Sequence, residues 1–412
     1  MKIQTITRDL NFKNINYSTI KGGNNKSRES NACKCNISII KTGIKNNINI
    51  IISADIIWFT EKVVQNLRNS IREMIKTEES NIVFCASHTH GSPFFKPKIL
   101  FKKNQDIVDI YLENTIFSLF KEVIKFKPVS VDPFFEIKIA SDLSINRRRK
   151  SLQFKKYPFF IMQSLPNKTK KIDNIINIIK FIRQDNKAVE CILVKYTCHP
   201  VSDPDNTVGA DYPGYLRDYL KKKLMNNLIF LQGFCGDIRP KLIKKNKTFK
   251  DKIIKLLIGD RFRKPVKGDS ENIAKHISII IKNNSKNITK INSKFAIKSK
   301  SIKLFLPLDN NSYSDKKLEI TIWIWDKICF LFISAEVLSS YSFKNIEGLN
   351  IINIGYSNGM IGYLPTEKDI KSGGYEIDKS RLFFGLMERV SNKAEELIKS
   401  KIYKEIRKLN KK

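Results

Sequence analysis

Three of the four histidines have a spacing that suits a metal site. His88 and His90 stand two positions apart, and the third is His199. In an extended segment, residues two apart point to the same face, so this pair could offer two ring nitrogens to one metal ion, or one to a metal and one to a substrate. A histidine pair alone is more often structural. The fourth histidine, His276, lies in a lysine-rich helical pattern and is expected at the surface or in packing.

Five polar residues each follow an apolar run that has the pattern of a strand. Asp55, His88, His199, Asp237 and Glu336 come after the runs 48–52, 82–86, 192–194, 229–231 and 318–332, respectively. In α/β sheets, ligands gather beyond the carboxyl ends of strands, where loops aim side chains into a shared crevice. We therefore expect these five side chains to lie near one another.

The elements between these residues alternate, which predicts an α/β fold of mixed β-sheets flanked by helices, with the ligand site at the carboxyl ends of strands. Helices are expected after Thr60, over 106–124 and after Asp211. Residues 241–285 are lysine-rich and helical and are expected to be a peripheral insertion. Residues 318–332 are expected to form a hairpin that turns near Asp326, and 378–412 a terminal helix. No domain boundary is evident, so 1–412 is predicted to be one domain.

The charge and the cysteines limit the surroundings of the protein. The 412 residues carry a formal net charge of +35. The lysines are scattered and not interleaved with aromatic residues, which favours a coding bias over a specific nucleic-acid surface; attraction to anionic membranes remains compatible with the charge. The seven cysteines are odd in number and mostly in apolar runs, typical of buried free thiols. With no apolar signal region and no membrane-length run, a cytoplasmic location is expected.

Several segments together resemble the neutral, non-lysosomal ceramidases. The motifs that carry the resemblance are ASHTHGSP at 86–93, NRR at 146–148, YTCHP at 196–200, GADYPG at 209–214, LQGFCGDIRP at 231–240, SAEV at 334–337, SN at 357–358, GY at 362–363 and GYE at 374–376. They occur in the order of that family and span most of the chain. Each motif is modest alone, and jointly they are specific.

The resemblance implies a zinc ion bound by four residues: His88, His199, Glu336 and Tyr363. It also implies that His90, Arg147 and Tyr375 act on an amide substrate. Zinc lowers the pKa of a bound water to about 7, and an amide nitrogen needs a proton to leave. His90 would supply that proton as general acid, while Arg147 and Tyr375 would stabilise the oxyanion.

Asp55 and Asp237 are expected to orient ligating histidines or to shape turns rather than to bind the metal. Other roles compete for the remaining residues. Glu336 would otherwise be a strand-end carboxylate paired with a lysine. Arg147 stands in a run of three arginines that would normally be a solvated loop. Tyr363 and Tyr375 would be ordinary half-buried aromatics.

The chain departs from the family in three ways. No signal peptide is evident, no C-terminal β-sandwich domain is expected, and Gly91-Ser92 reverses the usual order of small residues after the second histidine. The resemblance implies ceramide or another N-acyl lipid as substrate, and thereby a role in sphingolipid metabolism. The alternatives are a deacylase of non-lipid N-acyl compounds, such as sugars or peptides, and a non-catalytic basic binding protein.

Overall fold

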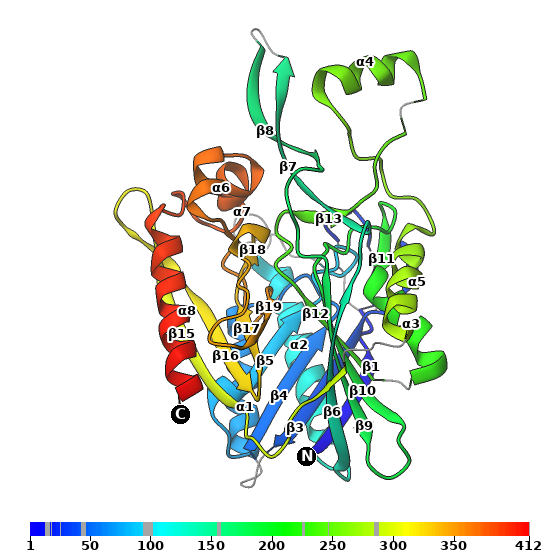
Figure 1. Cartoon of the computed structure of the whole chain (residues 1–412), viewed down its shortest axis with the longest axis vertical. Coiled ribbons are helices and arrows are strands. Elements are labelled where there is room, and N and C mark those ends of the chain that lie inside the picture. Colours follow the sequence, from blue (N-terminus) through cyan, green and yellow to red (C-terminus); the bar gives the residue numbers. More distant parts are fainter. Residues whose placement is uncertain are drawn as a thin grey trace.

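Two packed β-sheets form the centre of the protein in a computed structural model (Figure 1). The structure describes residues 1–12, 17, 19–24, 26–42, 47–93, 102–154, 158–224, 227–245, 247–283 and 288–411. The larger sheet has nine strands in the order β12-β10-β9-β6-β1-β3-β4-β5, with β14 paired to β6. Its strands are β1 (Lys2–Asp9), β3 (Lys34–Thr42), β4 (Asn47–Ala54), β5 (Ile82–Ala86), β6 (Val129–Ile139), β9 (Ile175–Arg183), β10 (Val189–Tyr196), β12 (Leu228–Gln232) and β14 (Ile288–Lys290).

The smaller sheet comes from the C-terminal part of the chain, in the order β15-β16-β17-β19. It consists of β15 (Lys298–Pro307), β16 (Tyr313–Trp325), β17 (Ile328–Ile333) and β19 (Asn350–Ile354). The expected hairpin is confirmed: β16 and β17 pair antiparallel across a turn in which Asp326 has φ of 52°. Three further groupings lie outside these sheets: β13 (Ile238–Pro240) with β7 (Ser144–Phe154) and β8 (Pro158–Asn167), β2 (Arg28–Asn31) with β11 (Thr207–Gly209), and β18 (Glu336–Val337) with β20 (Tyr363–Leu364).

The helices are α1 (Glu61–Met74), α2 (Lys102–Val123), α3 (Tyr212–Leu224), α4 (Phe249–Ile258), α5 (Asp269–Lys282), α6 (Glu367–Ser372), α7 (Ser380–Phe383) and α8 (Lys393–Lys411), with short turns η1 (Glu79–Asn81), η2 (Ser339–Tyr341) and η3 (Tyr375–Lys379). Of these, α1, α2, α3, α5 and α8 pack on the outer faces of the two sheets, which confirms the predicted α/β class. As expected, Thr60 caps α1, accepting a hydrogen bond from the amide of Val63.

Strand periodicity explains the layers. Along β4, Ile50 and Ile52 pack under α1 and α2, whereas Ile51 points to the other face and packs against the smaller sheet. Along β17, Phe330 faces the larger sheet and Leu331 faces α8. Because successive side chains alternate, central strands such as β4, β5 and β17 are buried on two faces and are almost continuously apolar. The order of layers is therefore helices, sheet, sheet, helix.

Two expected segments differ from their sequence-based bounds. Residues 241–285 are not one peripheral insertion, since α5 packs with α3 on the larger sheet through buried residues such as Ile277. Within residues 241–285, α4 is the helix that stands away from the sheets (Figure 1). The terminal helix begins at Lys393, because 378–392 forms the end of η3, the short α7 and a loop. All seven cysteines are buried free thiols, and within the described ranges no helix is long and apolar enough to cross a membrane.

A buried ion pair joins the two halves of the fold. Arg68 of α1 donates to both carboxylate oxygens of Glu319 on β16, at 2.9 and 2.7 Å, and also to the carbonyl of Ile82 on β5. The Arg68 side chain is 1% exposed. A buried guanidinium needs such a partner, because an unpaired charge away from water is strongly unfavourable.

We predict that Arg68→Ala lowers the free energy of unfolding by about 3–5 kcal/mol, because it leaves the buried Glu319 with only the more distant Lys303, at 3.9 Å, as a cation. Urea denaturation followed by circular dichroism measures this loss. Arg407 provides a matched control, since it pairs with Glu347 at 3.0 Å on the exposed surface. Arg407→Ala should change the stability by less than about 1 kcal/mol. Equal losses in the two variants would contradict the assignment.

Candidate metal centre

His88 and His199 are held in one orientation by main-chain carbonyls. His88 follows β5, and its Nδ1 lies 2.8 Å from the carbonyl oxygen of Ile57. His199 follows β10, and its Nδ1 lies 2.9 Å from the carbonyl oxygen of Ile238. A carbonyl oxygen only accepts, so both Nδ1 atoms carry the proton and both Nε2 atoms present a lone pair. This is the arrangement that a metal-ligating histidine needs.

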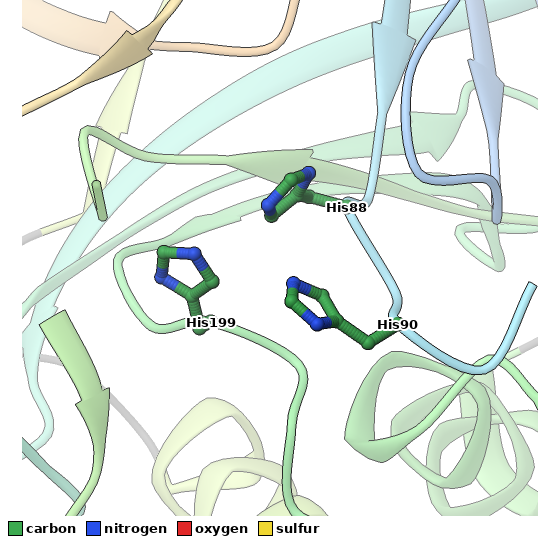
Figure 2. A group of neighbouring side chains, drawn as sticks. All are labelled: His88, His90 and His199. Carbon is green, nitrogen blue, oxygen red and sulfur yellow. The ribbon is translucent and has the colours of Figure 1, made fainter. Parts of the chain in front are cut away.

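The three histidine rings converge from two loops (Figure 2). The ring centre of His88 lies 5.1 Å from that of His90 and 5.0 Å from that of His199. We expected His88 and His90 to share a face because their segment would be extended. The two rings do lie close together, but the segment is not extended. His88 adopts the left-handed conformation, with φ of 63°, so the chain leaves the strand after Ala86 and turns. Such a backbone costs free energy and is retained where the surrounding structure fixes it.

Glu336 completes a compact group of donors. The ligand atoms of the three histidines lie within 4.8 Å of one another, so they form a group that could hold a metal ion. Glu336 Oε2 lies 3.5 Å from His88 Nε2 and 3.4 Å from His199 Nε2. Two ligands about 2.0–2.1 Å from a tetrahedral zinc ion are about 3.4 Å apart. These separations are long for hydrogen bonds and match ligands around a shared ion.

The electrostatics of the group favour a neutral imidazole beside a carboxylate. Burial lowers the pKa of His199 to about 4, in spite of the neighbouring Glu336. Burial also opposes ionisation of Glu336, but the adjacent His88 and His199 outweigh it and hold the pKa of that carboxyl well below its usual value. Neutral nitrogen donors and one carboxylate oxygen are a donor set that zinc accepts.

His90 differs from the other two histidines in its hydrogen bonding. Its Nε2 is buried, and no atom of the described residues hydrogen-bonds to it. Burial, together with the neighbouring His88 and His199, lowers the pKa of His90 well below its usual value. Among the described residues no carbonyl is recorded as a partner of this ring, which leaves its Nε2 free to bind a metal or a substrate.

Two buried residues that the sequence did not single out support the histidines. Gln232, at the end of β12, donates through Nε2 to the carbonyls of Ser87 and Cys198, at 3.0 and 2.9 Å. It therefore ties together the residues that precede His88 and His199. Tyr356 stacks on His88 with ring centres 4.1 Å apart. Its hydroxyl lies 3.4 Å from Glu336 Oε2. Gln232 ends β12 and Tyr356 comes just after β19. A polar residue at a strand end is a signal that could have identified both.

Tyr363 lies directly beside Glu336. The two residues are paired in register in the parallel strands β18 and β20. Arg147, at the base of β7, donates from Nη2 to the hydroxyl of Tyr363 at 3.0 Å and from Nε to Glu376 at 2.9 Å. The ring of Tyr375 meets that of Tyr363 edge to face, with centres 6.1 Å apart, and Tyr375 is 52% exposed. The structure therefore brings every residue expected to bind metal or substrate to one place.

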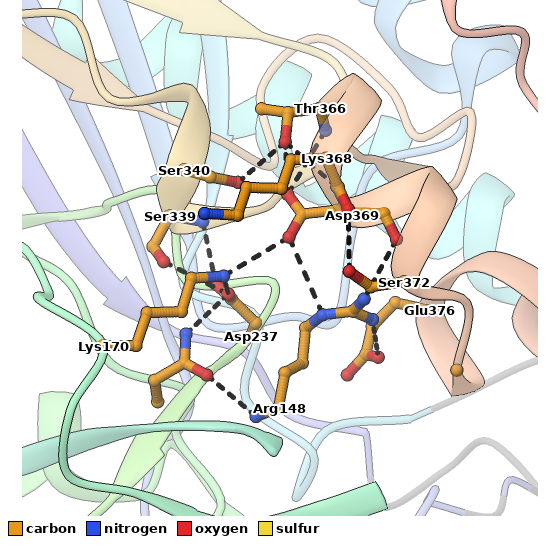
Figure 3. Close-up of polar contacts among 12 residues, drawn as sticks. Arg148, Lys170, Asp237, Ser339, Ser340, Thr366, Lys368, Asp369, Ser372 and Glu376 are labelled. Carbon is orange, nitrogen blue, oxygen red and sulfur yellow. Dashed lines mark hydrogen bonds and ion pairs between the residues drawn. The ribbon is translucent and has the colours of Figure 1, made fainter. Parts of the chain in front are cut away.

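The three consecutive arginines have separate surroundings. Arg147 faces Tyr363. Arg148 is buried and donates to the other oxygen of Glu376 at 2.6 Å and to the carbonyl of Gly373 at 2.8 Å (Figure 3). Arg149 donates to carbonyls at the end of α4, including that of Asp260 at 2.9 Å. The run is thus not a solvated loop, and Glu376 holds Arg147 and Arg148 on one carboxylate.

The two aspartates at strand ends shape the loops without contacting the histidines through their side chains. Asp55 binds Arg217 and accepts from the amide of Lys34. Asp237 accepts from the amide of Ser339 at 2.8 Å and from Asn146 at 2.6 Å, and Figure 3 shows it at the edge of the network around Arg148. The carbonyls of Ile57 and Ile238, which lie one or two residues further on, orient the histidines instead.

Comparisons with known proteins identify the fold. No protein-family model matches the chain, and no curated protein matches its sequence. Among solved structures, the chain is similar to the neutral ceramidase from Pseudomonas aeruginosa, with a TM-score of 0.67 and 10% identity over 91% of this chain and 70% of that one. It is also similar to a ceramidase complexed with C2, with a TM-score of 0.70 and 10% identity over 96% of this chain and 73% of that one. The chain therefore has the neutral ceramidase fold that its motifs indicated.

We predict that Arg148→Ala lowers the free energy of unfolding by about 3–5 kcal/mol, because Arg148 donates to Glu376 and to the carbonyls of Asp369 and Gly373, so three acceptors lose a donor. Arg147→Ala is the matched variant. It should lower the stability by only about 1–2 kcal/mol, since Glu376 keeps Arg148 as its partner. Urea denaturation of both variants measures the difference. If Arg147→Ala were as destabilising as Arg148→Ala, the separate roles of the two arginines would be refuted.

Proposed function

We propose that this protein is a zinc-dependent hydrolase that cleaves the amide bond of a ceramide or another N-acylated lipid. The observation that carries the proposal is the position of Glu336 Oε2, 3.5 Å from His88 Nε2 and 3.4 Å from His199 Nε2. Both histidines are oriented by carbonyls, so their free lone pairs converge on one point together with the carboxylate. The similarity of the fold to ceramidases supports the class of reaction.

His88, His199 and Glu336 would hold the ion, with the Tyr363 hydroxyl as a fourth ligand. Two imidazoles and one carboxylate are a hydrolytic zinc set that keeps a position open for substrate. Zinc bound in this way supplies a water nucleophile at neutral pH and polarises a carbonyl. The competing set replaces Glu336 by His90, whose ligand atom lies within 4.8 Å of those of the other two histidines. We favour Glu336, because carbonyls orient the rings of His88 and His199, whereas none of the described residues does so for His90.

His90 would act as the general acid. Its Nε2 has no partner among the described residues, and its ring lies next to the two ligating rings. A proton held on this atom would pass to the amide nitrogen as the C–N bond breaks, which turns a poor leaving group into a neutral amine. Glu376 and Tyr363 hold Arg147 in a fixed position, and Arg147 and Tyr375 would donate hydrogen bonds to the developing oxyanion. Removing one such donor from an enzyme typically costs about 3–4 kcal/mol of transition-state stabilisation.

Two further proposals concern the domain organisation and the cellular compartment of the protein. We propose that the chain forms one catalytic domain, because both sheets share a core between them. We also place the protein in a reducing compartment such as the cytoplasm, because its seven cysteines are buried unpaired thiols.

We predict that His88→Ala and His199→Ala lose both the metal and the activity, because each removes a ligand. His90→Ala should keep the metal and lose about 10²–10⁴-fold in kcat, the contribution of a general acid. Metal analysis of the purified variants, together with amide hydrolysis rates, measures both effects. His276→Ala serves as the control, since that residue is exposed on α5. A metal-free His90→Ala variant would overturn the assignment of His90 and favour the set of three histidines.

We predict that the zinc-loaded protein hydrolyses long-chain N-acyl lipids at least tenfold better, in kcat/KM, than the matching N-acetyl amides. The reason is that each buried methylene of the acyl chain contributes about 0.8 kcal/mol. Hydrolysis of a series of chain lengths in detergent micelles measures this preference. Activity on acetyl amides alone would favour a deacylase of sugars or peptides. A folded protein that binds no zinc and hydrolyses neither would favour a binding protein.

A further inference from the structure

The helix α4 has its apolar face turned outward. Phe249 is 79% exposed and Leu256 is 85% exposed, and Ile253 and Leu257 beside them are also exposed. With 3.6 residues per turn, these four side chains lie within about 100° of one another around the helix. A surface helix of a globular protein normally turns such a face to the core.

The opposite face of α4 carries the polar contacts that attach it to the body. Asp251, the single acidic residue of the helix, is buried and binds Lys244 at 2.7 Å and Arg261 at 2.6 Å. The carbonyl of Ile258, the last residue of α4, accepts from Ser151 of β7 at 3.0 Å. The helix is therefore fixed with its apolar face outward.

The hairpin of β7 and β8 extends the same surface. Phe160 is 72% exposed, and Phe159 beside it is also exposed. Figure 1 shows that α4 and this hairpin project from the same end of the molecule, beside each other. The base of the hairpin holds Arg147 of the candidate site. Phe160 pairs with Leu152, five residues along β7 from Arg147, or about 17 Å at 3.3 Å per residue.

The charged residues beside the outward face of α4 are lysines. Helical geometry places Lys250 and Lys252 on either side of the outward face of α4, and Asp251, the acid of this helix, is turned inward. An amphipathic helix with apolar side chains on one face and lysines along its edges is the form that lies in the interface of an anionic bilayer. The net charge of +35 adds a long-range attraction to such a surface.

We infer that α4 and the neighbouring part of β8, with Phe159 and Phe160, dock the protein on an anionic lipid bilayer. The surface consists of Phe159, Phe160, Phe249, Ile253, Leu256 and Leu257. Docking there would bring the candidate site, at the base of the hairpin, close to the lipid surface from which an N-acyl lipid is taken. This purpose rests on the proposed function, whereas the docking itself requires no hydrolysis.

Sedimentation of the full chain with vesicles tests the inference. The wild-type protein should bind vesicles of phosphatidylcholine and phosphatidylserine, and bind less with added salt or with phosphatidylcholine alone. The double variant F249S/L256S should bind at least about tenfold more weakly, because two large apolar side chains no longer enter the bilayer. Phe295→Ser is the matched control: Phe295 is 55% exposed and lies near the Asp326 turn, at the end of β17 away from Glu336.

Two results would overturn the inference. One is equal binding of wild-type protein and F249S/L256S to anionic vesicles. The other is a wild-type dimer in size-exclusion chromatography that F249S/L256S converts to a monomer, which would assign the surface to a second copy of the chain. Hydrolysis separates this inference from the proposed function. F249S/L256S should keep its rate on a detergent-dispersed N-acyl amide and lose rate on the same lipid in vesicles. Vesicle binding without any hydrolysis would leave the docking intact and refute the proposed function.

Discussion

A buried carboxylate between two imidazoles governs the arrangement of the whole centre. Glu336 lies in the short strand β18, just after β17 of the smaller sheet, whereas His88 and His199 follow strands of the larger one. Placing a carboxylate away from water is unfavourable unless cations or donors compensate it. In the proposed centre, a metal cation held where the ends of β5, β10 and β17 meet would provide that compensation. The formation of the centre therefore depends on the packing of the two sheets.

The connections between the sheets hold this junction in register. The segment that follows β19 reaches both sheets: the amide of Gly355 bonds to the carbonyl of Gln232, and that of Tyr356 bonds to the carbonyl of Ala335. Asp237 adds a second connection, since its carboxylate accepts from Ser339 and its carbonyl accepts from the amide of Arg147. The residues proposed to contact a substrate are thus attached to the same loops as the residues proposed to bind a metal.

The sequence predicted where the candidate site residues lie along the strands better than it predicted which residues they contact. Apolar runs that end in polar residues identified His88, His199 and Glu336, because strand ends converge in this class of fold. Sequence patterns could not show that Glu336 comes from a separate sheet, since pairing between sheets depends on contacts distant in the chain. They also left two roles open for Asp55, orienting a histidine or shaping a turn, and could not show that its carboxylate binds Arg217. The outward face of α4 was missed because periodicity shows that a helix is amphipathic and not which side is buried.

The use of Ile57 and Ile238 as hydrogen-bond acceptors has a consequence for how such a centre changes over time. Every residue type offers the same carbonyl oxygen, so substitutions at these two positions leave the acceptor in place as long as the loop keeps its path. The orientation of the histidines therefore depends more on the path of the main chain than on the identity of the side chains at these positions. A centre of this kind can survive extensive sequence drift, which is consistent with a shared fold at 10% identity.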